Sequence, residues 1–115
     1  MYKQGDIVLI PVPFSDLSSN KKRPVLIISS NTYNSLTDDI IVVAVTSNIT
    51  NKKYCVDIEE TDIFEGQLPA KSQVRADKIY TLAQSIIIKK IGCVTKEFVN
   101  ITVNSMIEIF IELPK

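Results

Sequence analysis

The stretch Arg23-Pro24-Val25-Leu26-Ile27-Ile28-Ser29 decides the fold of this chain, because it contains the most distinct predicted strand. Residues 25–28 are an unbroken β-branched and aliphatic run, which is typical of a strand buried on both faces. Pro24 lacks an N–H and therefore fits the first residue of such a strand. Arg23 then lies where a polar loop meets the sheet, and its guanidinium can reach solvent or a ligand. The alternative is an ordinary exposed arginine at a strand end.

The composition indicates a compact globular protein. The chain has 115 residues, of which 45% are hydrophobic, so we expect a single domain over residues 1–115 with its own core. The formal net charge is zero, and a polyanionic partner must therefore be bound by a local cluster of charges. Cys55 and Cys93 show no metal-ligand spacing and are expected to be buried free thiols. We find no signal peptide and no apolar run of membrane-spanning length, and expect a cytoplasmic protein.

Histidine and tryptophan are absent from the sequence. The absence of histidine excludes histidine acid–base pairs, serine–histidine triads and histidine-ligated metals, and no metal or cofactor is expected. Catalysis would have to use carboxylates, arginine, lysine, hydroxyls or thiols. Among the thirteen basic residues, only Arg23 and Arg75 are arginines. The planar guanidinium suits bidentate recognition, so a chain this rich in lysine is expected to keep arginine where that geometry matters.

Hydrophobic patterning predicts six or seven short strands and one helix. The strands are expected at residues 7–14, 25–28, 40–47, 54–58, 72–82 and 86–91, and polar connections at 15–22, 30–35 and 48–53. Thr95 fits an N-cap, and the apolar residues that follow at helical spacing predict an amphipathic helix to about Ile111. This order of elements predicts a mainly β protein, namely a small, mostly antiparallel barrel with a C-terminal helix.

Residues 72–77 alternate polar and apolar side chains. Successive side chains of a strand point to opposite faces, so Val74 and Ala76 are predicted to face the core together. Arg75 and Asp77 then share the other face, two residues apart. The alternative interpretation of this pair is a surface ion pair without a function.

Three positions combine groups that can act on a phosphodiester: Arg23 at a strand start, Thr46-Ser47 at a strand end, and Arg75 with Asp77 on one strand face. Arginine binds a phosphate bidentately, and a hydroxyl can donate to a further phosphate oxygen. A carboxylate within reach of a hydroxyl can accept its proton. RNA carries a 2′-hydroxyl beside every phosphate, and this hydroxyl is a latent nucleophile. These groups are sufficient for RNA cleavage without a metal, whereas DNA lacks the 2′-hydroxyl and would not be cut.

Four segments, in this order, resemble the MazF/PemK (Kid) toxins of toxin–antitoxin systems: Gly5-Asp6-Ile7-Val8, Arg23-Pro24-Val25-Leu26-Ile27, Val42-Val43-Ala44-Val45-Thr46-Ser47 and Val74-Arg75-Ala76-Asp77. The resemblance runs from about Gly5 to Gly92. It implies a small SH3-like β-barrel, a homodimer, and a ribosome-independent endoribonuclease that acts on short single-stranded sequences in mRNA. It also implies neutralisation by a labile cognate antitoxin whose disordered tail occupies the RNA groove.

The family's functional residues carry over by position. Arg23 and Thr46 match the arginine and threonine that the MazF branch uses on the scissile phosphate. Arg75 and Asp77 match the Arg-x-Asp that the Kid branch uses as acid and base. The first loop departs from the family pattern, because some members have histidine or a glycine-rich Glu-Gln segment where this chain has residues 18–22, and the substrate sequence is left open. The residues expected to contact RNA are Asn20, Lys21, Lys22, Ser47 and Ser72.

Two alternatives to an endoribonuclease stay open on the sequence. One is a non-catalytic toxin of the same fold that inhibits DNA gyrase. In that family the C-terminal helix carries a tryptophan and a glycine at its gyrase-binding end, whereas this chain ends at residues 108–115 with neither. The other is an inactive RNA-binding barrel, against which the presence of Arg23, Thr46, Arg75 and Asp77 argues.

Overall fold

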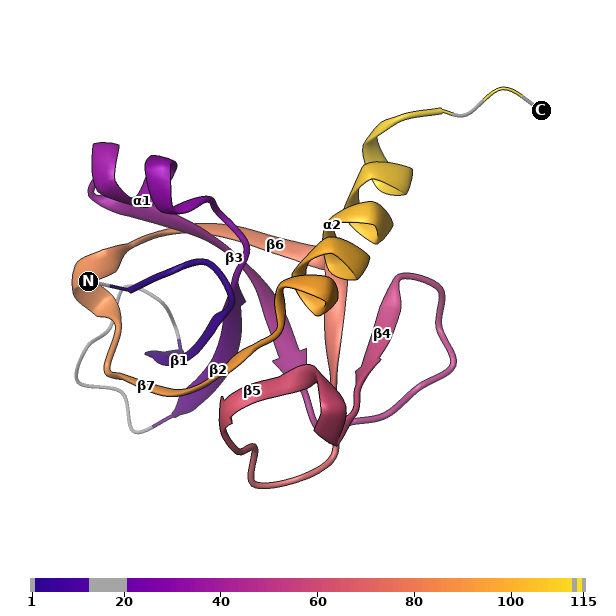
Figure 1. Ribbon diagram of the computed structural model, residues 1–115, viewed down its shortest axis with the longest axis horizontal. Coiled ribbons are helices and arrows are strands. Elements are labelled where there is room, and N and C mark those ends of the chain that lie inside the picture. Colours follow the sequence, from indigo (N-terminus) through magenta and orange to yellow (C-terminus); the bar gives the residue numbers. More distant parts are fainter. Residues whose placement is uncertain (1, 13–20, 113, 115) are drawn as a thin grey trace.

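The computed structural model describes residues 2–12, 21–112 and 114 (Figure 1). Within these residues, seven strands are present: β1 (Asp6–Pro11), β2 (Lys22–Ile27), β3 (Asp39–Thr46), β4 (Cys55–Ile58), β5 (Ile63–Gly66), β6 (Ser72–Ala83) and β7 (Lys89–Val94). The described helices are α1 (Asn31–Leu36) and α2 (Lys96–Phe110), with short 3₁₀ turns at Glu60–Asp62 and Gln84–Ile86.

The described strands form one antiparallel sheet in the order β4-β6-β3-β2-β1-β7-β5. The sheet curls strongly, and its two edge strands, β4 and β5, are not hydrogen-bonded to each other (Figure 1). The architecture is therefore a curled half-barrel with a C-terminal helix. The predicted mainly β, antiparallel fold with a C-terminal helix is confirmed.

Two hydrophobic clusters occupy the two faces of the curled sheet, and β2 contributes to both. Leu26 and Ile28, the residue after β2, belong to the first cluster, and Val25 and Ile27 belong to the second. The uninterrupted apolar run of this strand is thus explained by burial on both faces. Burying one such side chain stabilises a fold by roughly 1.5–3 kcal/mol, so this strand is a main contributor to the core.

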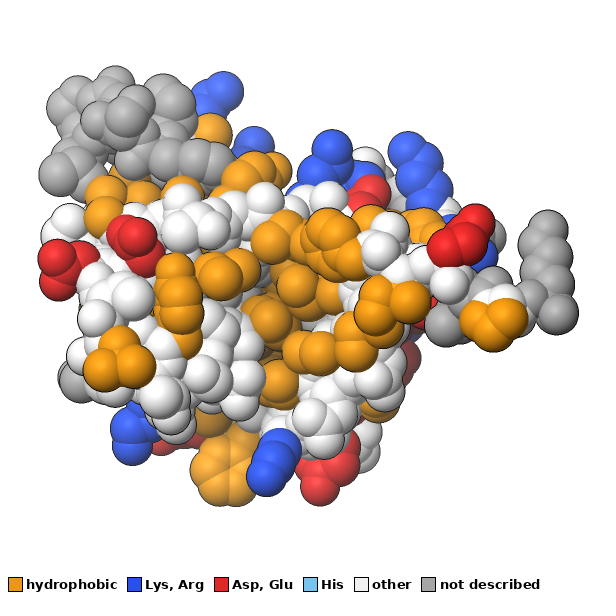
Figure 2. Space-filling view, turned by 90° about the horizontal axis from the view of Figure 1, so that it is seen from above, with side chains coloured by type: hydrophobic (Ala, Val, Ile, Leu, Met, Phe, Trp, Pro, Cys, Tyr) orange, Lys and Arg blue, Asp and Glu red, His pale blue; other side chains and the backbone are white. Residues whose placement is uncertain are grey.

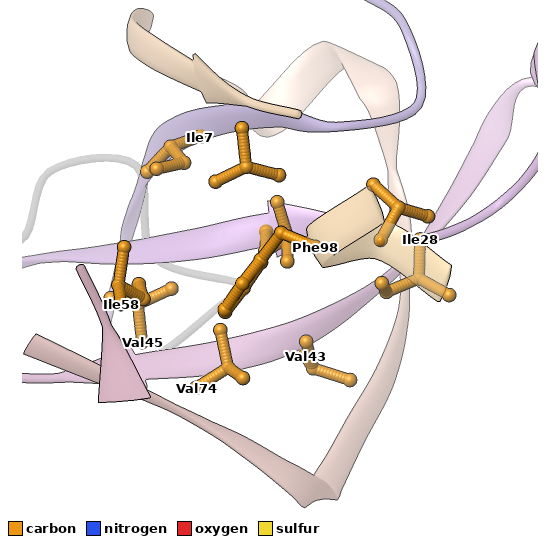
Figure 3. Close-up of a cluster of buried hydrophobic side chains, with 10 residues drawn as sticks. Ile7, Ile28, Val43, Val45, Ile58, Val74 and Phe98 are labelled. Carbon is orange, nitrogen blue, oxygen red and sulfur yellow. The ribbon is translucent and has the colours of Figure 1, made fainter. Parts of the chain in front are cut away.

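Helix α2 covers the first cluster with the aromatic ring of Phe98. Figure 3 shows Phe98 lying among side chains from several strands, including Ile7, Val43 and Val74. The helix begins where the sequence predicts, because the Thr95 hydroxyl accepts a hydrogen bond from the Phe98 N–H at 3.2 Å. It ends at Phe110, as expected from the apolar spacing.

Several element boundaries differ from the sequence prediction. Helix α1 replaces the polar connection expected at 30–35, since Ser30 caps it by accepting from the Tyr33 N–H, and six residues are too few to show a helical period. Strand β5 was not expected within the acidic connection after residue 58. The last strand starts at Lys89 rather than at residue 86, because the 3₁₀ turn Gln84–Ile86 precedes it. The part of the first predicted strand beyond Val12 lies outside the described residues.

Both cysteines are free, as expected, but each is only partly buried. No helix among the described residues is long and apolar enough to cross a membrane.

Candidate active site

The strand registers bring Arg23, Thr46 and Arg75 to one face of the sheet. Residues paired directly across neighbouring strands point to the same face. Ala44 of β3 pairs with Val25 of β2 and with Arg75 of β6, so these three side chains share a face. Arg23 lies two residues before Val25, and Thr46 lies two residues after Ala44, so both alternate onto that face as well. Three predicted site residues therefore lie on three adjacent strands.

This face belongs to the second hydrophobic cluster, on the side of the sheet away from Phe98. Val25 and Ile10, the register partner of Arg23, are buried in that cluster. Arg23 itself is exposed. The strand anchors the stem of the arginine while its guanidinium is presented to solvent.

Arg75 and Asp77 form a side-on ion pair at a bend of β6. The Arg75 Nε donates to Asp77 Oδ1 and the Nη2 donates to Oδ2, both at 3.3 Å. Their side chains are 27% and 35% exposed, whereas the intervening Ala76 is fully buried, as the alternation predicts. Between the register pairs Val43–Ile79 and Ala44–Arg75 the ladder shifts, so β6 bulges at 76–78. The Arg75–Asp77 pair lies at this bulge.

The pair keeps both side chains charged. Partial desolvation acts to raise the pKa of Asp77, but the hydrogen bonds and positive charge of Arg75 outweigh it, and the pKa of the carboxyl is lowered below its ordinary value. The hydrogen bond to Asp77 raises the pKa of Arg75. At neutral pH the site therefore presents a carboxylate and a guanidinium that already neutralise each other.

The remaining predicted site residues are placed as follows. Thr46 is half-buried at the end of β3, and its hydroxyl accepts a hydrogen bond from the Asn48 N–H at 3.0 Å, while Ser47 is exposed. Lys21 and Lys22 are exposed at the start of β2, and Asn20 lies outside the described residues. Ser72 is not brought together with the others: it is buried, its hydroxyl donates to the Ala70 carbonyl, and it shares a face with Val74.

Gln73 belongs to this face but was not among the predicted site residues. It is 3% exposed, and its amide N–H groups donate to the Thr50 carbonyl at 2.7 Å and to Asp57 Oδ1 at 2.8 Å. Its carbonyl oxygen accepts from the Thr50 N–H at 3.1 Å. Gln73 thus attaches the connection between β3 and β4 to the sheet beside Arg75. The alternating pattern places Gln73 on this face, but the sequence does not predict which groups it hydrogen-bonds.

The described residues contain no group of three carboxylate or thiol side chains placed to bind one metal ion. A pocket of about 870 Å³ lies elsewhere, between the C-terminal end of β4 and β5, and is lined by Ile58, Glu59, Ile63 and Leu68 among others. It contains none of Arg23, Thr46 or Arg75.

The fold and this face define a small half-barrel protein with a charged, hydroxyl-bearing surface suited to a phosphodiester. Residues 3–110 match the sequence profile of the PemK-like, MazF-like toxins of type II toxin–antitoxin systems. The chain therefore belongs to this toxin family, as the sequence motifs indicated.

Solved structures share the fold over nearly the whole chain. An endoribonuclease in complex with its cognate antitoxin, from a mycobacterial species, has a TM-score of 0.79 at 22% identity and covers 99% of this chain and 100% of its own. A second mycobacterial endoribonuclease has a TM-score of 0.76 at 24% identity, over 98% and 95% of the two chains. A MazE–MazF structure from Deinococcus radiodurans has a TM-score of 0.75 at 16% identity, over 95% and 94%. None of the curated proteins matches this chain.

Proposed function

We propose that this protein is a sequence-specific, metal-independent endoribonuclease toxin that cleaves single-stranded RNA, including mRNA, and is neutralised by a cognate antitoxin. The observation that carries this proposal is the presence of Arg23, Thr46 and the Arg75–Asp77 pair on one face of the sheet. Membership of the toxin family and the likeness to mycobacterial endoribonucleases, one of them bound to its antitoxin, support it.

In the proposed reaction the 2′-hydroxyl of the RNA attacks the adjacent phosphorus. Asp77 accepts the proton of this hydroxyl, and the new bond from O2′ to phosphorus expels the 5′-oxygen of the next nucleotide. Arg23 and Thr46 bind the non-bridging phosphate oxygens, on which negative charge develops in the transition state. The products are a 2′,3′-cyclic phosphate and a 5′-hydroxyl.

Asp77 becomes an effective base when Arg75 turns toward the substrate. In the free protein the guanidinium lowers the pKa of Asp77, and this makes the carboxylate a weak base. A bound phosphate competes for the Arg75 donors, which are held by long hydrogen bonds of 3.3 Å. Because a guanidinium keeps its proton at neutral pH, we assign to Arg75 the stabilisation of charge, and to water the proton that the leaving 5′-oxygen takes up.

The toxin is proposed to act as a homodimer whose RNA groove is formed by both subunits. Helix α2 carries three of the exposed large hydrophobic side chains, Ile101, Ile107 and Phe110, and Ile111 follows directly. Figure 2 views the molecule from the side of the two helices and shows hydrophobic side chains gathered in one continuous patch. Apolar patches of this kind mark interaction surfaces, and a second copy of the chain would cover it.

The test is incubation of the purified protein with a long single-stranded RNA in EDTA, followed by mapping of the cut sites and of the chemical ends. We expect undiminished cleavage at a short recurring sequence, with 2′,3′-cyclic phosphate and 5′-hydroxyl ends. A DNA of the same sequence serves as the control and should stay intact. Products with 5′-phosphates, or activity that needs Mg²⁺, would contradict the proposal.

A further inference from the structure

The loop from Ser47 to Tyr54 lies next to the Arg75–Asp77 pair, but the proposed mechanism makes no use of it. Strand β4 follows this loop, and its first residue, Cys55, is the register partner of Arg75. The Ala76 N–H donates to the Tyr54 carbonyl at 2.9 Å. The backbone of Tyr54 is therefore fixed opposite the residue that separates Arg75 from Asp77.

The loop is held in place by a buried side chain. The amide of Gln73 bonds both backbone groups of Thr50 in the middle of the loop, and Gln73 also bonds Asp57 in β4. Because Gln73 is almost fully buried, water does not compete effectively for these bonds. Gln73 thus anchors the middle of the loop to the sheet beside Arg75.

Tyr54 occupies a backbone position that normally favours glycine. Its φ is 69°, and it is the one non-glycine residue with positive φ in the described part of the chain. It closes a turn in which the Cys55 N–H donates to the Lys52 carbonyl. Glycine or asparagine fits such a turn without strain, whereas a residue with a bulky side chain does not. Backbone strain of this kind is concentrated at functional sites, which makes Tyr54 a candidate functional residue.

The ammonium group of Lys53 lies over the aromatic ring of Tyr54. The Lys53 Nζ lies 5.3 Å from the ring centroid, and the neighbouring Lys52 is exposed. Proteins bind single-stranded nucleic acid with this combination, in which a base stacks on an aromatic ring and a nearby ammonium binds the backbone phosphate. A ring and an ammonium on a loop that is anchored beside an arginine therefore suit one nucleotide of a single strand.

We propose that Tyr54 and Lys53 form a nucleotide subsite beside the cleaved phosphate. A base flanking the cut stacks on Tyr54, Lys53 binds the adjoining phosphate, and Gln73 is a positioning residue that holds the loop. The proposal rests on the proposed RNA cleavage. It adds residues that recognise the substrate without taking part in the chemistry.

The kinetic test compares Tyr54→Gly with Tyr54→Phe on a short RNA containing one mapped cut site. Glycine removes the ring and also suits the positive φ, so the variant is expected to fold at least as stably as the parent. We expect Tyr54→Gly to raise KM by about tenfold or more, with a smaller change in kcat, whereas Tyr54→Phe stays close to the parent. Lys53→Gln should weaken binding and reduce its salt dependence. The matched control, Lys96→Gln at the exposed start of α2, should change neither.

A spectroscopic measurement separates stacking from a structural effect. The same RNA carries 2-aminopurine beside the cut and a methylated 2′-oxygen that prevents cleavage. The parent and Tyr54→Phe should quench the fluorescence on binding, and Tyr54→Gly should not. If the parent cleaves RNA while Tyr54→Gly retains the parent's KM and quenching, the subsite is wrong and the proposed function stands. If the parent neither binds nor cleaves RNA, both are wrong.

Discussion

The side-on contact between Arg75 and Asp77 sets the acid–base state of the candidate site before any substrate arrives. The guanidinium of Arg75 stabilises the negative charge of the Asp77 carboxylate. Both side chains are about one-third exposed, so water also solvates both charged groups. Solvent screening keeps such a pair weak, so its contribution to stability is small. Its main consequence is therefore chemical: it lowers the proton affinity of the Asp77 carboxylate and keeps the Arg75 donors aligned.

Removing Arg75 should raise the pKa of Asp77. An aspartate with a folded pKa below its unfolded value of about 3.9 adds stability above that value, and this stability is lost as the pH falls through the folded pKa. In Arg75→Leu the hydrogen bonds and the positive charge are gone, while desolvation still acts. NMR titration of the Asp77 carboxyl should show a midpoint below the ordinary value in the parent and a higher midpoint in the variant. An unchanged midpoint would show that Arg75 does not control this carboxyl.

Arg23 and Asp77 should respond differently to substitution. Arg23→Lys should be nearly as harmful as Arg23→Ala, because lysine cannot reproduce the bidentate fork. Donors that stabilise transition-state charge are commonly worth about 10²–10³ in rate, and a loss of that size is expected. Asp77→Asn removes the proton acceptor while keeping the shape, and it should also impair cleavage, though less than loss of Arg23.

Single-turnover rates on an RNA with one cut site measure these effects. Circular dichroism should show that each variant keeps the fold. If Asp77→Asn cleaves at the parent rate while Arg23→Ala is inactive, Asp77 only positions Arg75 or the substrate, and the chemistry rests on Arg23 and Thr46.

At the scale of elements, the threonine that caps helix α2 and the threonine inside it are in opposite situations. The Thr95 hydroxyl caps the helix by accepting from the Phe98 N–H. The Thr102 hydroxyl is fully buried and has no hydrogen-bond partner within the described residues. Burying a hydroxyl removes its hydrogen bonds to water, and without a partner in the protein this free-energy cost is not offset.

The same substitution should therefore have opposite effects at these two positions. Thr95→Val removes the cap and should lower the free energy of unfolding by about 1 kcal/mol. Thr102→Val keeps the shape of the side chain and removes the unpaired hydroxyl, so it should raise the free energy of unfolding by about 1 kcal/mol. Urea denaturation of both variants, each compared with the parent, measures the two changes. Destabilisation by Thr102→Val would mean that its hydroxyl has a partner in solution.

The elements differ in how far the sequence predicts them, for physical reasons. Strand β2 was predictable because burial on both faces leaves a continuous apolar run. Residues 74–77 were predictable because the buried Val74 and Ala76 alternate with the more exposed Arg75 and Asp77. Helix α1 has only six residues, and the 3₁₀ turn Gln84–Ile86 has three, so neither shows a period. The bulge of β6 at 76–78 is a property of the pairing with β3, which a single strand does not encode.

The same distinction applies to the candidate site. Motif spacing and alternation together select Arg23, Thr46, Arg75 and Asp77. For each of these residues, the strand that contains it determines the face to which its side chain points. The contacts of Gln73 with Thr50 and Asp57 join segments up to 23 residues apart, and no local pattern encodes them. Ser72 follows the same alternation but falls on the buried face, so the expectation that it contacts RNA is not supported.

At the scale of the whole molecule, the two faces of the curled sheet have different roles. One face is covered by α2 through Phe98. The other carries the charged side chains of the candidate site. In Figure 1 the C-terminal half of α2 rises away from the sheet, and its apolar side chains at Ile107 and Phe110 are left exposed. A partner subunit that covers this half of α2 would leave the charged face accessible to RNA.

A charge placed on this exposed half of α2 should therefore dissociate the proposed homodimer. Phe110 is 71% exposed, so Phe110→Asp costs little stability within one protomer but introduces a charge into the apolar interface. Phe64→Asp is the matched control, because Phe64 is 78% exposed on β5, which lies away from the C-terminal half of α2 (Figure 1). Light scattering at micromolar concentration should give about twice the 12.9 kDa chain mass for the parent and Phe64→Asp, and the monomer mass for Phe110→Asp.

Since both subunits are proposed to form the RNA groove, Phe110→Asp should also lose cleavage. A monomeric parent would contradict the homodimer, and a dimeric Phe110→Asp would place the interface elsewhere.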